Sequence, residues 1–449
     1  MYIDFLLKIF EKNKKNTAII WNDKEYSYQW LLAKIYSYKD YLQSNKIESG
    51  NVTAILGDFS PTSISLLLAL ISNKDIIIPL THLKREDINK KLSIAGAEFL
   101  FAIDNDDKLS MKELNYSIES NFYNKLIEVQ HPGLVLFTSG TSGEPKAAVH
   151  DFSKLLQKFK TSRNSFRTVN FLLFDHWGGL NTLFHTLSNG GVVLSLHDRS
   201  PDKVCNFIDK HKIELLPASP TFLNLLLLSD SYKKYNLSSL KLISYGTEPM
   251  PESTLKRIKT IFPNIRLLQT YGLIELGVLR SKSRSDDSLW VKIGGEGFST
   301  RVVNGILQIK ADSAMLGYLN APSPFTDDGY FITGDAVEVD GDYYKILGRQ
   351  SELINVGGEK VYPAEVENVI LQFDGVEEVT VYGEKNDITG NIVCAKVRLK
   401  FTTNQREFVK NLKRYCRSKL ASFKVPVKII ITDELQHSDR FKKKRVDSY

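Results

Sequence analysis

The sequence has few cysteines, and they lie far apart. Cys205, Cys394 and Cys416 are the only three among 449 residues. Disulfide scaffolds are dense in cysteine, and structural zinc sites use closely spaced pairs. This scarcity argues against both classes and predicts a protein of the reducing cytoplasm.

Long apolar runs are also missing. A membrane-spanning helix needs about 20 consecutive apolar residues, and no segment of the sequence reaches that length. The opening MYIDFLLKIFEKNKKN has too short an apolar part for a signal peptide and is too charged afterwards. We expect a short amphipathic helix there and no stable membrane insertion. Internal repeats and low-complexity linkers are absent as well.

The chain lacks a strong excess of one charge. Its formal net charge of +7 comes from 59 Lys and Arg against 52 Asp and Glu, and part of the excess lies in the tail, at 442–445. Because acidic residues are mixed through the rest, we expect a solvated basic surface and no nucleic-acid partner. The alternative is attraction to phosphate-bearing ligands or to an acidic carrier protein.

The length and the hydrophobic pattern predict a large α/β domain. The chain is longer than one typical domain, and its 42% hydrophobic content is ordinary for a soluble protein. Helical spacing at 28–46 is followed by a strand-like run at 52–57, and a buried helix at 63–73 precedes a strand at 75–80. This alternation is typical of a mainly parallel sheet covered by helices.

The pattern changes twice towards the C-terminus. From residue 300, short strands with turn signals predict a β-rich subdomain. After Gly348 and Arg349 we expect a small, mobile α+β domain. The predicted domains are therefore 1–348 and 349–449, with a hinge at Gln350 and Ser351. The elements predicted in the small domain are helices at 363–373 and 403–420 and strands at 378–384 and 391–399.

The segment FTSGTSGEPKAAVH, at 137–150, has the composition of a phosphate-binding loop. Glycines let the backbone approach an anion, while hydroxyls and a lysine complete the cage, which suits a polyphosphate. It is not the ordinary P-loop, because Ala147 follows Lys146. A flexible turn is the alternative. The candidate phosphate ligands are Thr138, Ser139, Gly140, Thr141, Ser142, Gly143 and Lys146.

Together with four further segments, this loop resembles the adenylate-forming superfamily of acyl-CoA synthetases, carrier-protein adenylation domains and firefly-type luciferases. The resemblance covers nearly the whole chain. It implies ATP and Mg²⁺ as cofactors and a carboxylic acid as substrate, with CoA or phosphopantetheine as the acyl acceptor. The further segments, in order, are QTYGLIE at 269–275, TGD at 333–335, GRQSELINVGGEKVYPAEVE at 348–367 and LQHSDRFKKKR at 435–445.

Joining a carboxylate to the α-phosphate of ATP requires charge neutralisation and positioning more than covalent catalysis. The resemblance implies that Tyr271 stacks on the adenine and that Glu275 holds Mg²⁺, a cation that prefers carboxylate oxygens. The resemblance also assigns Gly272 to the binding of the carboxylic acid substrate. Ile274 departs from the family pattern, which has a phosphate-binding threonine there. A core tyrosine beside a surface glutamate is the alternative.

Two further residues are assigned to the ribose by the resemblance. Asp335 has two acceptor oxygens, which match a cis-diol, and Arg349 reaches the ribose or the phosphates. The backbone that passes the adenine edge would be that of Gly246, Thr247 and Glu248. An ordinary turn explains Gly246 and the neighbouring proline equally well, and an ordinary Gly-Asp turn is the alternative for Asp335.

The tail resembles the family pattern L-P-x-x-x-x-G-K-x-x-R, in which the lysine serves the first half-reaction. Leu435, Lys442 and Arg445 fall at those spacings, but Gln436 and Phe441 replace the proline and the glycine. Lys442 is therefore the predicted catalytic lysine, in a run of lysines that leaves the register ambiguous by one residue. A disordered basic tail is the alternative.

The acid site is predicted around His176, in a segment that resembles the F-H-x-x-G motif of acyl-CoA and aryl-CoA ligases. Asp175 supports the rival interpretation, because amino-acid-activating relatives pair an aspartate near here with the substrate amine. The distance to Gly190 and Gly191 favours an aryl or aliphatic acid without an α-amine.

The sequence thus predicts a cytoplasmic, two-domain ligase that forms an acyl-adenylate and passes the acyl group to CoA or to a carrier protein. Ser351 occupies the hinge position. Three alternatives remain: a stand-alone enzyme that activates α- or β-amino acids, a catalytically weak binding or regulatory homologue, and an oxidative, luciferase-like enzyme.

Overall fold

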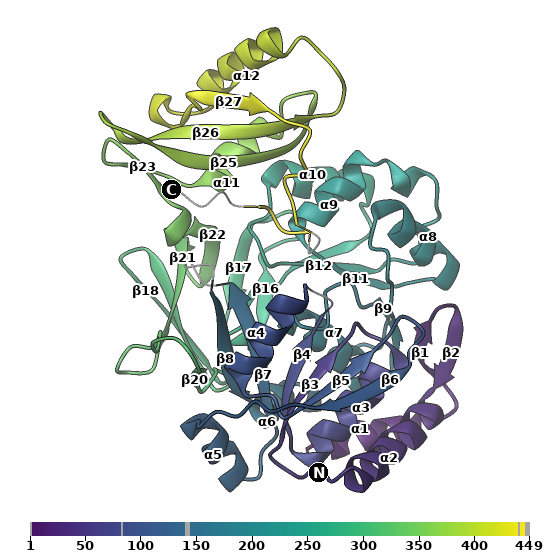
Figure 1. The fold of residues 1–449 in the computed structure, drawn as a ribbon. Helices are drawn as coiled ribbons and strands as arrows, with labels where there is room; N and C mark the ends of the chain where they lie inside the picture. Colours follow the sequence, from purple (N-terminus) through teal and green to yellow (C-terminus); the bar gives the residue numbers. More distant parts are fainter. Residues whose placement is uncertain (1, 82–83, 140–143, 439–440, 445–449) are drawn as a thin grey trace.

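A mainly parallel sheet and a mixed sheet form most of the N-terminal part in the computed structural model, which describes residues 2–81, 84–139, 144–438 and 441–444 (Figure 1). The first is seven-stranded, and all its neighbouring strands are parallel except the β1–β2 pair. Its strands, in spatial order, are β13 (Arg266–Gln269), β12 (Leu242–Tyr245), β11 (Leu215–Ala218), β9 (Arg167–Val169), β10 (Val192–Leu194), β1 (Thr17–Trp21) and β2 (Lys24–Ser27).

The second sheet carries the strands that flank the predicted phosphate loop. Its centre is parallel, whereas β6, β8 and β20 pair in antiparallel fashion. Its strands, in spatial order, are β20 (Gly317–Tyr318), β8 (Pro145–Asp151), β7 (Gly133–Ser139), β4 (Ile76–Leu80), β3 (Val52–Leu56), β5 (Phe99–Ile103) and β6 (Leu109–Glu113).

Helices cover both sheets, and one of them is buried almost throughout. α3 (Pro61–Asn73) is buried from Pro61 to Ser72, as expected for a helix that is apolar on every side. Ser60 caps it in a capping box, and Pro61 occupies its first turn. The largest apolar core joins α3 to side chains of β1, β5 and β7. The other helices here are α1 (Asp4–Lys12), α2 (Tyr28–Ser44), α4 (Arg85–Ala95), α5 (Asn121–Glu128), α6 (Phe152–Leu156), α7 (Trp177–Ser188), α8 (Pro201–His211), α9 (Pro220–Leu228) and α10 (Glu252–Ile261).

A six-stranded antiparallel sheet forms the predicted β-rich subdomain. A short hairpin, β14 (Gly272–Leu273) and β15 (Gly277–Val278), precedes it in the chain. In spatial order its strands are β16 (Ser281–Ser283), β17 (Trp290–Ile293), β22 (Tyr343–Arg349), β21 (Phe331–Asp340), β19 (Ile306–Ala311) and β18 (Phe298–Val303).

The small C-terminal domain lies beside α9 and α10 and has its own apolar core (Figure 1). The chain leaves β22 at Arg349, forms a 3₁₀ turn at Gln350–Glu352 and enters the next sheet at Ile354. The predicted boundary after residue 348 thus falls at the end of β22. The remaining elements are β23 (Ile354–Val356), β24 (Glu359–Val361), α11 (Pro363–Ile370), β25 (Val376–Asn386), β26 (Gly390–Leu399), α12 (Gln405–Lys419) and β27 (Lys428–Ile431).

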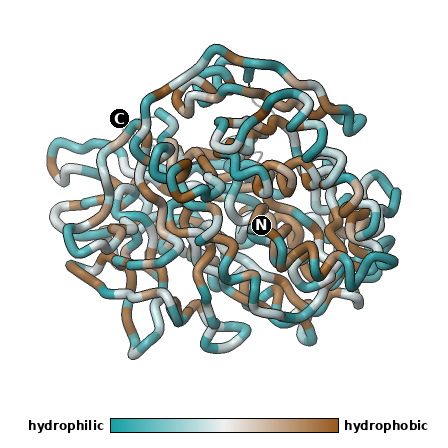
Figure 2. The backbone as a smooth tube through the Cα atoms, turned by 90° about the horizontal axis from the view of Figure 1, so that it is seen from below, coloured by the Kyte–Doolittle hydropathy of each residue, from teal (hydrophilic) through white to brown (hydrophobic). Residues whose placement is uncertain are grey.

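The predicted fold class is confirmed, and the predicted helices at 28–46 and 403–420 correspond to α2 and α12 within two residues at each end. Figure 2 shows hydrophobic segments concentrated inside and hydrophilic segments along the outer loops. Within the described residues, no helix combines the length and the apolar character that a membrane crossing requires.

One buried carboxyl in the second sheet predicts a pH-dependent stability. Asp75 is fully buried and directly precedes β4. Asn73 Nδ2 donates to its Oδ1 at 3.0 Å, and its Oδ2 has no partner among the described residues. Burial, with the nearby charge of Glu98, raises the pKa of the Asp75 carboxyl well above its usual value. The unfolded chain still ionises near pH 4, so this group lowers stability as the pH rises from about 4 towards the folded-state pKa.

We therefore expect Asp75→Asn to stabilise the fold by about 1–3 kcal/mol at pH 8, the cost of a buried polar group without a partner. The gain should shrink towards pH 5. Urea unfolding of both proteins at pH 5 and pH 8 measures this difference. A gain of equal size at both values, or a loss at pH 8, would contradict the assignment.

Candidate active site

The predicted adenine segments meet at the carboxyl ends of β12 and β13. Thr270 donates to the Tyr245 carbonyl from its backbone N at 2.7 Å and from its hydroxyl at 3.0 Å. A side chain at Gly246 would place Cβ only 2.6 Å from the Thr270 carbonyl oxygen, so only glycine allows this approach. Thr247 adopts a left-handed φ of 74°, and Glu248 Oε1 accepts from the Thr221 backbone N at 3.3 Å.

A buried carboxylate links these segments to the β-rich subdomain. The Asp335 side chain is in contact with both Tyr271, whose hydroxyl donates to Oδ2 at 2.5 Å, and Arg349, whose Nε lies 2.8 Å from Oδ1. Asp335 and Arg349 are direct partners in the β21–β22 register, and Arg349 also donates to the Thr333 carbonyl at 2.8 Å. Burial raises the pKa of Asp335, while the Arg349 charge and the Tyr271 hydrogen bond oppose that rise. Each carboxylate oxygen keeps a second lone pair that could accept from a ligand.

Glu275 and the strand that carries Lys146 approach each other through Tyr318. The Tyr318 hydroxyl donates to Glu275 Oε1 at 2.5 Å, and Lys146 Nζ lies 5.7 Å from the Tyr318 ring centroid. Tyr318 belongs to β20, which pairs with β8. No motif in the sequence marked this tyrosine, because its role depends on a two-residue strand.

The described part of the phosphate loop is a β7–β8 hairpin. Thr138 pairs with Lys146 and Ser139 with Pro145 across the two strands. The other four predicted ligands, Gly140, Thr141, Ser142 and Gly143, lie outside the described residues. Likewise, Arg445 of the tail motif lies outside them.

Magnesium was expected at Glu275. Among the described residues, no group of three or more His, Cys, Asp and Glu side chains could hold a metal. A single carboxylate fits Mg²⁺ nevertheless, because this ion keeps several waters and takes its other ligands from substrate phosphates.

Two neighbouring lysines of the tail have different surroundings. Lys443 Nζ pairs with Glu367 Oε2 at 2.5 Å, and the Glu367 side chain is only 2% exposed. The backbone N of Lys443 also lies 3.3 Å from Glu248 Oε2, beside the predicted adenine segment. Lys442, by contrast, lines a small cavity of about 20 Å³ together with His176 and Arg199. Lys442 and Lys443 therefore face different parts of the protein, although they are adjacent in the chain.

The two departures from the tail motif are accommodated by specific contacts. The Gln436 backbone N donates to Glu378 Oε2 at 2.8 Å, and His437 Nδ1 lies 2.6 Å from Glu378 Oε1. Phe441 has a left-handed φ of 51°, a conformation that favours glycine. Ser219 Oγ donates to the Phe441 carbonyl at 2.6 Å. Residues 431–438 and 441–444 are therefore folded against the rest of the protein, and the disordered-tail alternative does not hold for them.

His176 begins α7 as its N-cap residue. Its Nδ1 accepts from the Gly178 backbone N at 3.0 Å, which places the proton of the neutral ring on Nε2. Asp175 is buried and accepts from the Thr81 hydroxyl at 3.1 Å. It is not among the described residues that line the cavity with Lys442. Gly272 allows the close β14–β15 hairpin, since a Cβ there would lie 2.8 Å from the Gly277 carbonyl oxygen.

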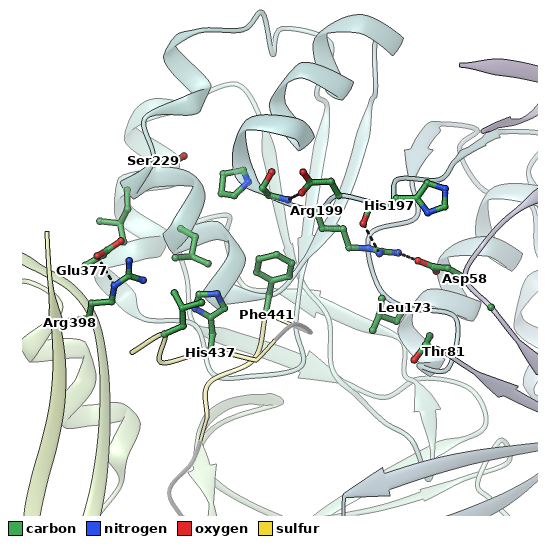
Figure 3. Close-up of a pocket in the computed structure, with 17 residues that line it drawn as sticks. Asp58, Thr81, Leu173, His197, Arg199, Ser229, Glu377, Arg398, His437 and Phe441 are labelled. Carbon is green, nitrogen blue, oxygen red and sulfur yellow. Dashed lines mark hydrogen bonds and ion pairs between the residues drawn. The ribbon is translucent and has the colours of Figure 1, made fainter. Parts of the chain in front are cut away.

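A larger cavity of about 690 Å³ lies between the small domain and the N-terminal part (Figure 3). Arg199 pairs with Asp58 at 2.7 Å on one side, and Arg398 lies 3.3 Å from Glu377 on the small domain. Sequence reasoning missed this cavity because its lining comes from segments far apart in the chain. Ser351, the predicted hinge residue, is exposed in the 3₁₀ turn at Gln350–Glu352.

A large α/β domain and a small C-terminal domain lie around the predicted site residues, as the resemblance to adenylate-forming enzymes implies, and the family comparison agrees with that class. The model described as AMP-binding enzyme matches residues 8–304, and the one described as AMP-binding enzyme C-terminal domain matches 365–442. The chain therefore belongs to this family of adenylate-forming enzymes.

Two curated relatives are informative. The long-chain-fatty-acid–CoA ligase FadD13 of Mycobacterium tuberculosis is 28% identical over 67% of this chain and 64% of its own length. A 2-succinylbenzoate–CoA ligase of Listeria monocytogenes is 25% identical over 96% of both chains.

Solved structures share the fold. The anthranilate CoA ligase AuaEII in complex with anthranoyl-AMP has a TM-score of 0.83 at 19% identity, covering 98% of this chain and 95% of that one. ATP-bound MatB from Rhodopseudomonas palustris has a TM-score of 0.78 at 23% identity, covering 98% and 97%.

The Lys443–Glu367 pair yields a stability prediction. Lys443→Met leaves a buried carboxylate without its cation, which typically costs about 3–5 kcal/mol of unfolding free energy. The double variant Lys443→Met/Glu367→Gln should recover part of that loss. Lys444→Met is the matched control, because Lys444 is exposed. Chemical unfolding of the four proteins tests the pair, and equal stability of the Lys443 and Lys444 variants would contradict it.

Proposed function

We propose that this protein activates a carboxylic acid with Mg·ATP, releases pyrophosphate and transfers the acyl group from the adenylate to a thiol. The observation that carries the proposal is the position of Lys442. It lies in one small cavity with His176, while the adjacent Lys443 contacts Glu248 in the predicted adenine segment. Two consecutive residues of the tail thus contact both the proposed carboxylate site and the predicted adenine segment.

In the proposed first half-reaction, the residues act by positioning and charge. Asp335 and Arg349 bind the ribose, the 246–248 backbone and Tyr271 bind the adenine, and the residues from Thr138 to Lys146 hold the phosphates. Lys442 places its ammonium between the attacking carboxylate and the α-phosphate, where negative charge develops. Bound Mg²⁺ would neutralise the phosphates beside Glu275.

For the second half-reaction we propose rotation of the small domain about Ser351. The turn Gln350–Glu352 is short and lies between two sheets, and Gln350 and Ser351 are exposed in it, which suits a position where backbone angles change. The 690 Å³ cavity, which adjoins the cavity of Lys442 and His176, is the proposed route of the thiol.

The acid is proposed to be aryl or aliphatic, without an α-amine. Asp175 supports this choice, because the Thr81 hydroxyl occupies one of its oxygens and it does not line the described cavity of Lys442. The relatives act, by their names, on a long-chain fatty acid and on 2-succinylbenzoate. They are CoA ligases, which favours CoA as acceptor over a carrier protein. We place the enzyme in the cytoplasm.

Lys442→Ala should reduce acid-dependent pyrophosphate–ATP exchange by roughly two to four orders of magnitude, the scale of a lost preorganised charge. Thioester formation from pre-made acyl-adenylate should survive, because the lysine acts only in the first step. Equal losses in both assays would contradict this division. Exchange should be screened with aliphatic, aromatic, α-amino and β-amino acids, and no exchange with any acid would contradict the proposed activity.

Asp175→Asn separates the two substrate classes. An amide still accepts the Thr81 hydrogen bond, so we expect exchange within about tenfold of the wild type, the scale of one neutral hydrogen bond. His176→Ala should reduce exchange more than Asp175→Asn does. Exchange that prefers an amino acid and disappears in Asp175→Asn would instead assign the enzyme to the amino-acid class.

A further inference from the structure

Phe441 forms part of the wall between the two cavities. The large cavity between the domains and the small cavity of Lys442 share Leu173, Arg199 and Phe441 in their linings. Leu173 and Arg199 belong to the N-terminal part, whereas Phe441 belongs to the tail. Figure 3 shows its ring rising from the tail between His437 and the Arg199–Asp58 pair.

The ring is held on several sides by aromatic groups. Its centroid lies 5.5 Å from that of Phe171 and 5.4 Å from that of Phe222. The imidazole of His437 stacks on it at 5.8 Å, with the planes 11° apart. These contacts anchor the ring at the boundary, although its backbone conformation suits glycine better.

Phe441 and Lys442 are consecutive in the chain, so any motion that withdraws the lysine also withdraws the ring. The ring is present at the boundary in the same conformation in which Lys442 reaches the cavity of His176.

We propose that Phe441 is a gate that separates the carboxylate site from the large cavity while Lys442 is engaged. This inference rests on the proposed function and extends it to the order of the two steps. With the ring in place, water and thiol in the large cavity cannot reach the acyl carbon of the adenylate. Withdrawal of the tail removes the lysine and joins the two cavities in one movement.

The gate has a chemical consequence. If water reaches the acyl-adenylate, it attacks the acyl carbon, the bond from that carbon to the phosphate oxygen breaks, and free acid and AMP leave with the proton of the water. A closed gate suppresses this loss, so AMP is released mainly with thioester formation.

Phe441→Gly removes the ring and suits the left-handed backbone. We expect AMP release in the presence of ATP and acid, without thiol, to rise at least tenfold, while pyrophosphate exchange stays within about threefold because Lys442 is retained. Phe441→Tyr should behave as the wild type, and so should Phe401→Ala, which removes an exposed aromatic side chain elsewhere on the small domain. Unchanged AMP release in Phe441→Gly, or a fall in exchange as large as that of Lys442→Ala, would overturn the gate.

A second measurement does not depend on catalysis. Leu172 lines the small cavity but not the large one, and the native Cys205, Cys394 and Cys416 are buried. In a Leu172→Cys background, alkylation of residue 172 by iodoacetamide, followed by peptide mass spectrometry, reports access. We expect at least tenfold faster alkylation when Phe441→Gly is added. Equal rates would overturn the gate, whereas a wild type without exchange for any acid would overturn only the proposed function.

Discussion

The buried carboxylate of Asp335 is the constraint on which the arrangement of the site depends. A carboxylate only 5% exposed needs compensation for its lost hydration, and Arg349 and Tyr271 provide it. Arg349 is also the last residue of β22 before the turn that leads into the small domain. One ion pair therefore fixes the start of the linker, the proposed ribose site and the predicted adenine tyrosine in a single geometry.

Two further buried carboxylates hold the tail in position. Glu367 and Glu378 belong to the small domain, and they engage Lys443 and the segment at Gln436 and His437. The tail is thus attached to the small domain by charge and to the N-terminal part by the aromatic contacts of Phe441 and the Ser219 hydrogen bond. Breaking a buried ion pair leaves an uncompensated charge, so each of these carboxylates favours the arrangement that keeps its partner in place. Here the pair of Lys443 with Glu367 holds one of three successive lysines at the small domain, while its neighbour Lys442 lines the small cavity.

The sequence predicted the features that depend on local pattern. The alternation at 28–80 predicted the strands and helices of the α/β part, and ordered motifs predicted the family before any geometry was known. Features created by contacts between distant segments were not predictable. The pairing of Lys443 with Glu367 spans 76 residues and that of Arg199 with Asp58 spans 141. Similarly, nothing local indicates that the Thr81 hydroxyl occupies Asp175, or that Tyr318 contacts Glu275.

The two-residue strand β20 has a consequence for how tightly the site can be adjusted. A Cβ at Gly317 would lie 2.4 Å from the ring of Phe122 in α5, so the strand can pack this closely on that helix only because residue 317 is glycine. The adjacent Tyr318 pairs with Ala148 of β8 and donates its hydroxyl to Glu275, so the position of β20 bears directly on the position of that carboxylate. The packing of α5, a helix that carries none of the predicted ligands, therefore bears on where the carboxylate at the phosphate end is held.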